Sequence, residues 1–218
     1  MDAKEKIENA YIDYVLTNDE QPKSIYIFSK GIKLKEEDFY KYYNSFQAIE
    51  KGIWHQLFIN TIETIKNQEV YAGYSAREKI LAFFYTFIEM LKAKRSFVLY
   101  SLKHSGKRFT TPEVLRGIKN EFEKLALEII GEGFESNELN DRKFISDKYK
   151  DALWLQFAFI INFWAHDDSQ DFEKTDEAIE KGINVTLDLM SRSPIDNLIE
   201  YGKFLAQNSK FKPDFIFK

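Results

Sequence analysis

The sequence contains no cysteine among its 218 residues. This absence excludes disulfide bonds, thiolate zinc sites and thiol nucleophiles, and it is typical of a protein in a reducing compartment. Glycine and proline are also scarce, with 9 and 4 residues, which is unlike fibrous or low-complexity chains. The first residues lack the apolar core of a secretory signal. We therefore expect an ordered, helix-rich, cytoplasmic protein.

Motifs that would indicate an enzyme are missing as well. The sequence has no phosphate-binding loop, nucleophile elbow or Glu-x-x-His pair, so we expect no catalytic residues and no cofactor. His166, Asp167 and Asp168 form the one cluster that resembles a metal or base site. Because consecutive residues at a helix end point in different directions, a solvated, helix-capping cluster is favoured over metal binding.

The longest apolar segment runs from Ala152 to Ala165 and is interrupted only by Gln156 and Asn162. It is too short to cross a bilayer, which takes about 20 apolar residues, and too long for a strand. It therefore predicts a central helix, with Ser146 as its expected N-cap. A helix that is apolar all round must be covered all round. We expect its own domain to cover one side and a second copy of the chain to cover the other.

Aromatic residues are abundant, with 20 Phe and 12 Tyr. A large aromatic core explains them. A cavity lined by aromatic side chains that receives an apolar ligand is the alternative, and both can hold at once.

Apolar residues recur at helical spacing along the rest of the chain and predict an all-α fold. Ser75 with Glu78 predicts a capping box, and Pro112 predicts a helix start. The other predicted helices cover residues 4–16, 24–29, 36–43, 48–66, 75–92, 112–131, 176–191 and 194–208, with a shorter one after residue 96.

Three short helices with tight turns before residue 48 indicate a helix-turn-helix head. Residues 24–49 align without a gap to the pattern T-V-x-x-I-A-x-x-A-G-V-S-x-G-x-x-Y-x-Y-F-x-S-K-E-x-L, with the best matches at 39–43 and at Ser45. In this the chain resembles the TetR/AcrR family of regulators. The resemblance implies an all-α, TetR-like fold, with a head at 1–47 and a ligand-binding and dimerisation domain at 48–218.

The resemblance also implies DNA contacts in the head. The candidates are Lys23, Lys33, Lys35, Tyr40, Lys41 and Tyr42. A solvated basic fringe explains these lysines as well as a DNA footprint does. The net charge of −4 gives no overall attraction to nucleic acid.

Several positions depart from the family pattern. Lys33 replaces the turn glycine, and Lys35 replaces the serine that caps the recognition helix. That helix opens with three acidic residues that repel phosphate, Glu36, Glu37 and Asp38. Phe46 replaces the lysine that holds a phosphate. These departures weaken the expectation of operator binding.

In the body, the resemblance implies a homodimer through residues 148–165 and 176–191, and an apolar ligand among the middle helices. The residues that match the ligand region are Phe83, Phe84, Phe87, Phe97, Tyr100, Phe122, Leu125, Ile129, Trp154 and Phe157. A fully packed core without a cavity is the alternative.

A second resemblance concerns residues 167–175, which are similar to a stretch of the TetR-fold lipid-binding proteins of coenzyme Q biosynthesis. Those proteins have lost DNA binding and use a terminal amphipathic helix at a membrane. The last helix and the tail at 210–218 would be the analogue, although packing on the body is favoured. Two hypotheses follow: a regulator with an apolar effector, or a lipid- or partner-binding protein that no longer reads DNA.

Overall fold

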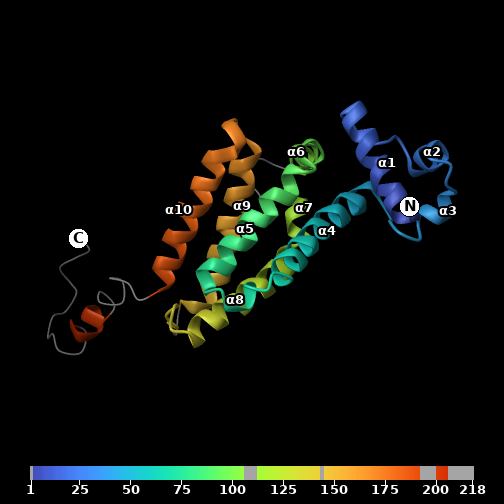
Figure 1. The fold of residues 1–218 in the computed structure, drawn as a ribbon. Coiled ribbons are helices and arrows are strands. Elements are labelled where there is room, and N and C mark those ends of the chain that lie inside the picture. Colours follow the sequence, from blue (N-terminus) through green and yellow to red (C-terminus); the bar gives the residue numbers. More distant parts are fainter. Residues whose placement is uncertain (1, 106–111, 143–144, 192–199, 206–218) are drawn as a thin grey trace, which may run out of the picture.

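The computed structural model describes residues 2–105, 112–142, 145–191 and 200–205. Within these ranges the chain is helical and contains no strand. The head consists of α1 (Ala3–Asn18), α2 (Ile25–Gly31) and α3 (Glu36–Phe39), and α4 (Phe46–Lys66) leads from it into the body (Figure 1). The predicted order of three short helices before a long one is confirmed.

Two boundaries in the head differ from the prediction. Helix α3 ends at Phe39 because the chain then turns tightly, and the N–H groups of Tyr42 and Tyr43 both donate to the Phe39 carbonyl. Helix α4 begins at Phe46 because Ser45 caps it, its hydroxyl accepting from the Ala48 N–H at 3.1 Å.

Further helices build the body in the part of the chain that the structure describes. They are α5 (Ala76–Lys92), α6 (Arg95–His104), α7 (Glu113–Arg116), α8 (Lys119–Glu135), α9 (Tyr149–Ala165) and α10 (Glu173–Met190). The capping box of Ser75 and Glu78 is present at the start of α5. Helix α5 packs against α4, α8 and α10, and α9 packs between α8 and α10.

Two local predictions in the body are wrong, and a third falls only partly within the described residues. The helix predicted over 112–131 is split into α7 and α8 around Gly117. Ser146 does not cap the central helix, because its hydroxyl accepts from the Arg142 N–H at 2.7 Å and α9 starts only at Tyr149. Of the helix predicted over 194–208, residues 200–205 are helical and the others lie outside the described residues.

The central helix α9 is not covered on every side within the single chain. Leu155 and Phe159 of α9 are 71% and 51% exposed, and Val185 and Leu189 of α10 are 60% and 52% exposed. The opposite side of α9 is buried in the body, as expected. We call the exposed apolar surface formed by these four residues the α9–α10 face.

No helix among the described residues is long and apolar enough to cross a membrane.

Candidate functional site

The turn of the helix-turn-helix keeps its left-handed backbone without a glycine. Lys33 stands at the turn position with φ of 55°, which an L-residue other than Gly, Asn or Asp rarely adopts. Its N–H donates to the Lys30 carbonyl at 3.2 Å, and the Leu34 N–H donates to Ser29 at 2.9 Å. The head thus holds a left-handed turn at Lys33, and this conformation lowers the free energy of unfolding relative to a glycine at the same position.

The acidic residues of α3 interact with neighbouring side chains of the head. Lys41 donates to Asp38 at 2.6 Å, and Lys35 donates to Glu37 at 3.4 Å. The hydrogen bond from Lys41 lowers the pKa of Asp38 and, in return, the Asp38 carboxylate raises the pKa of Lys41. Two of the candidate phosphate-binding lysines are therefore engaged by carboxylates of α3.

The remaining candidates are open to solvent. Tyr40 and Tyr42 are exposed, and neither Lys23 nor Lys33 has a carboxylate within ion-pair distance in the part of the chain that is described. Phe46 is buried and stacks on Tyr11 with ring centroids 5.5 Å apart. Phe46 therefore belongs to the hydrophobic core of the head and is not available to contact a phosphate.

The head carries a net negative charge. Between residues 1 and 47 the chain has seven lysines against nine aspartates and glutamates.

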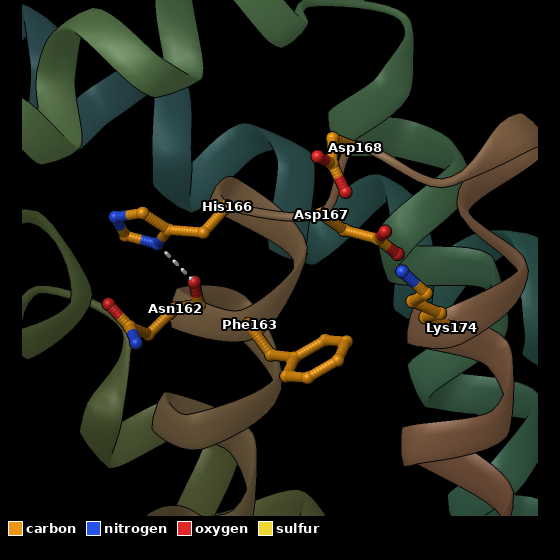
Figure 2. Close-up of a pocket in the computed structure, with 6 residues that line it drawn as sticks. All are labelled: Asn162, Phe163, His166, Asp167, Asp168 and Lys174. Atoms are coloured by element: carbon orange, nitrogen blue, oxygen red, sulfur yellow. Dashed lines mark hydrogen bonds between the residues drawn. The ribbon is translucent and has the colours of Figure 1, made fainter.

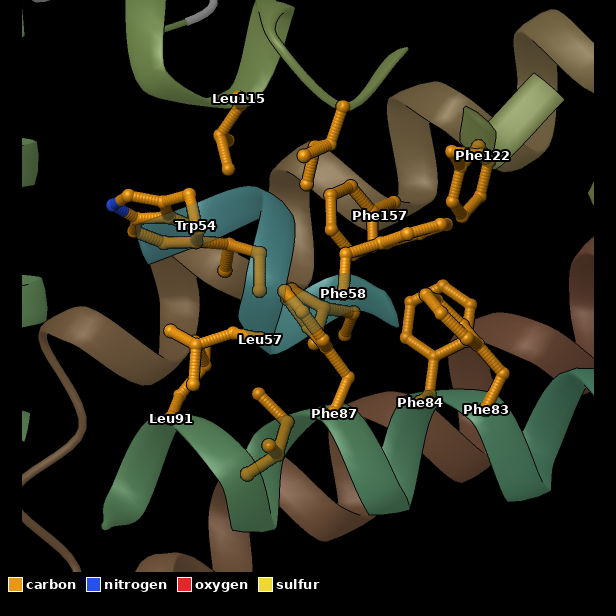
Figure 3. Packing of buried hydrophobic residues seen from close by; sticks show 14 of the residues in the cluster. Trp54, Leu57, Phe58, Phe83, Phe84, Phe87, Leu91, Leu115, Phe122 and Phe157 are labelled. Atoms are coloured by element: carbon orange, nitrogen blue, oxygen red, sulfur yellow. The ribbon is translucent and has the colours of Figure 1, made fainter. Parts of the chain in front are cut away.

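The predicted ligand residues form a closely packed aromatic core around Phe157. Its ring lies 4.8 Å from that of Phe122 and 5.3 Å from that of Phe87 (Figure 3). It also lies 5.4 Å from the ring of Trp154. Phe83 packs on the same ring at 5.9 Å. The ring planes in these four contacts are tilted by 30–44°, so none is the face-to-face sandwich that aromatic side chains disfavour.

Only a small void remains inside this core. Its volume is about 10 Å³, room for one water at most, and its lining is wholly apolar. The lining residues are Ile80, Phe83, Phe84, Phe122, Leu125, Ala126, Ile129 and Leu153. The side chains at this place are thus closely packed around a void of about 10 Å³.

Five predicted ligand residues line the void and five do not. Phe87, Trp154 and Phe157 pack beside it, whereas Phe97 and Tyr100 are buried on α6. The prediction omitted three lining residues, Ile80, Ala126 and Leu153. Helical spacing could have found Ile80, which lies one turn before Phe84.

A surface cleft of about 550 Å³ lies where α9 ends and α10 begins (Figure 2). It is lined by Asn162, Phe163, His166, Asp167, Asp168 and Lys174. The His166 ring points away from both aspartates, and its Nδ1 lies 2.8 Å from the Asn162 carbonyl. No three metal-binding side chains come together among the residues that the structure describes.

Asp167 corrects the expectation of a solvated cluster. It is only 6% exposed, and its carboxylate accepts four hydrogen bonds, from the backbone N–H and the hydroxyl of both Ser169 and Thr175, at 2.6–2.9 Å. Burial alone raises the pKa of Asp167, but these four bonds outweigh it and hold the pKa well below its ordinary value. Asp167 thus caps the first turn of α10 as a buried carboxylate.

Helix α6 connects this turn to the head. At its start, the Arg95 guanidinium stacks on Trp164 at 4.6 Å and on Phe172 at 4.5 Å, and it donates to the Trp164 carbonyl at 3.3 Å. At its end, Lys103 donates at 2.9 Å to Asp19, the residue that follows α1. Sequence patterns did not indicate either contact, because the partners lie 69 and 84 positions away in the sequence.

The structure therefore defines an all-helical protein with a helix-turn-helix head and a larger helical body. A family model described as "Tetracyclin repressor-like, C-terminal domain" matches residues 79–205, more than half of the chain. The chain belongs to the TetR family. A comparison with curated proteins gives no match.

Proposed function

We propose that this protein is a dimeric, cytoplasmic transcriptional regulator whose head binds duplex DNA and whose body binds an apolar effector. The observation that carries the DNA-binding role is the head itself. It keeps the left-handed turn at Lys33 despite the missing glycine, and it presents Tyr40, Lys41 and Tyr42 to solvent. A helix-turn-helix of this kind places its recognition helix in the major groove. We propose no catalytic role.

The proposed dimer forms through the α9–α10 face. Two-fold symmetry brings the same surface of each copy together, and burying four large apolar side chains contributes several kcal/mol. Leu155→Lys should convert the dimer to a monomer in sedimentation velocity. Leu127→Lys is the matched control, because Leu127 is equally apolar and 51% exposed on α8. Equal sedimentation of both variants as dimers would contradict this interface.

The proposed effector enters the void that Phe84 and Phe122 help to line. Because the void holds about 10 Å³, a ligand must displace these side chains, and the body must shift between a packed and an expanded state. A change in the separation of the two heads would then alter their fit to two DNA half-sites. An apolar lining selects a ligand with few polar groups.

The deciding experiment measures binding of the purified protein to duplex DNA from upstream of its own gene and to random duplex, across a salt series. A regulator loses affinity steeply with salt and prefers its own site. Neutralising the α3 carboxylates through Glu36→Gln, Glu37→Gln and Asp38→Asn should tighten binding to any duplex at least about tenfold at low salt. Glu69→Gln, an exposed substitution outside the head, is the control. No binding at low salt would remove the DNA-binding role.

One observation favours a second candidate, a TetR-fold protein that binds lipid or a protein partner and does not read DNA. The recognition helix engages Lys35 and Lys41 with its own carboxylates, and Phe46 lies in the core of the head. Absence of DNA binding, together with an apolar molecule found by mass spectrometry of the purified protein, would support this candidate.

A further inference from the structure

Glu50 is a buried carboxylate at the point where the head joins the body. It lies in the second turn of α4, the helix that leads from the head into the body (Figure 1), and it is only 4% exposed. Among the described residues, no lysine or arginine lies within ion-pair distance of it. A buried carboxylate without a countercharge is costly unless hydrogen bonds hold it.

The side-chain hydrogen bonds that Glu50 accepts come from the head. The Tyr11 hydroxyl of α1 donates to Oε1 at 2.6 Å, and Nε2 of Gln21, in the loop after α1, donates to the same oxygen at 3.1 Å. Tyr11 is fully buried, and burial together with the bond to Glu50 raises the pKa of Tyr11 far above its ordinary value. Its hydroxyl therefore stays protonated and remains a donor. The carboxylate thus ties α1 and the following loop to α4.

The body is attached to the same part of α4. One turn after Glu50, Nε1 of Trp54 donates to Oγ of Ser101 on α6 at 2.9 Å, and both side chains are buried. The Trp54 ring also contacts Phe87 of the aromatic core, with ring centroids 6.4 Å apart. Tyr100 of α6 lies near enough to Glu50 that burial, followed by the charge of this carboxylate, raises the pKa of Tyr100 to about 12. The first turns of α4 are therefore held by the head and by the body at once.

We propose that Glu50 is a positioning residue that fixes the orientation of the head on the body and so prepares the head to bind DNA. This inference rests on the proposed function. Apolar contacts are not directional, so apolar side chains alone would hold α1 against α4 over a range of rotations. Hydrogen bonds to a carboxylate are directional and stronger than neutral ones, so they favour one rotation. Two heads must match two half-sites at a fixed spacing, and a loosely held head often misses that match.

A role in stability alone would be served as well by apolar side chains. Replacing a buried polar pair by apolar groups of similar shape is often neutral or stabilising, whereas removing one partner leaves the other buried and unpaired. The double variant Tyr11→Phe, Glu50→Leu removes both partners at once and should melt close to the wild type. It therefore separates the orientation of the head from folding. Glu50→Gln alone keeps an acceptor oxygen for Tyr11 and should behave as the wild type does.

The orientation of the head can be measured directly, because the chain has no cysteine. Lys30→Cys on α2 and Leu127→Cys on α8, both at exposed positions, accept spin labels for pulsed dipolar spectroscopy. Excess unlabelled protein of the same sequence ensures that each particle holds one labelled chain. We expect a narrow distribution of distances in the wild-type background and a broader one in the double variant. Glu63→Leu, the same change at an exposed position of α4, is the matched control and should leave the distribution narrow.

Affinity for DNA connects this orientation to function. The probe is a duplex that the wild-type protein selects from a random pool. If the competent orientation falls to about one tenth of the population, the apparent affinity for this duplex falls about tenfold. Binding to unrelated duplex, which requires no match to half-sites, should change far less.

The outcomes distinguish the positioning role from the proposed function. An unchanged distance distribution in the double variant would overturn the positioning role of Glu50, as would a double variant that does not fold. A broader distribution with unchanged affinity for the selected duplex would overturn the link to DNA binding. If the wild type selects no duplex, the proposed function fails, while the distance distribution still decides whether Glu50 orients the head.

Discussion

Asp167→Asn should destabilise the protein strongly, although it keeps the shape of the side chain. The aspartate carboxylate accepts from the N–H and hydroxyl groups of Ser169 and from those of Thr175, the last of which is fully buried. An asparagine amide keeps one acceptor oxygen and turns a donor toward the other pair of donors.

The magnitude follows from these bonds. Hydrogen bonds to a charged group are worth about 1.5–3 kcal/mol each but are not additive within one site. Losing the charge and two acceptor positions should lower the free energy of unfolding by about 2–4 kcal/mol. For a chain of this size the midpoint of thermal unfolding should then fall by roughly 2–4 °C for each kcal/mol of stability lost.

The loss should depend on pH. The bonds lower the pKa of Asp167 in the folded state, so its contribution to stability is complete above the unfolded pKa of about 3.9 and declines as the pH falls below it. Urea unfolding of wild type and variant at pH 7 and at pH 3 measures this difference, which should shrink at the lower pH.

Asp168→Asn is the matched control, because Asp168 is the adjacent, exposed aspartate and forms no hydrogen bond with the described residues. It should change stability by less than about 0.5 kcal/mol. Equal stabilities for the two variants would refute the assignment of Asp167 as a buried cap.

Three further changes have expected outcomes. Lys33→Gly should stabilise the chain by about 1 kcal/mol in denaturant, because φ of 55° suits glycine, whereas Lys33→Ala should not. Arg95→Lys should lower the free energy of unfolding by about 1–2 kcal/mol, since it keeps the charge but loses the stacking on Trp164 and Phe172. Phe157→Ala should cost about 3–5 kcal/mol and open an apolar cavity. Benzene should then raise its melting temperature but leave the wild type unchanged.

Periodicity and capping residues were enough to predict the all-α fold and most of its helices. The start of α5 at its capping box and the buried side of α9 depend on local sequence, which a pattern records. The break between α7 and α8 at Gly117 and the delayed start of α9 are local details that hydrophobic periodicity does not record. Ser146, for example, bonds to Arg142 instead of capping the helix.

The sites were less predictable, because side chains from distant helices build them. The family resemblance pointed to Phe83, Phe84 and Phe122, which line one void, but it could not show that the void holds only about 10 Å³. Nor could it distinguish Asp167 from Asp168. Adjacent aspartates have opposite environments here because one faces the first turn of α10 and the other faces solvent.

Helix α6 has a thermodynamic consequence for the whole molecule. Its ten residues span about 15 Å and are fastened at both ends, by Arg95 to the turn after α9 and by Lys103 to the residue that follows the first helix of the head. The ion pair of Lys103 and Asp19 is exposed and contributes about 0–1 kcal/mol, which limits the energy that this contact can transmit between the turn and the head. Any coupling between the two ends of α6 is reciprocal.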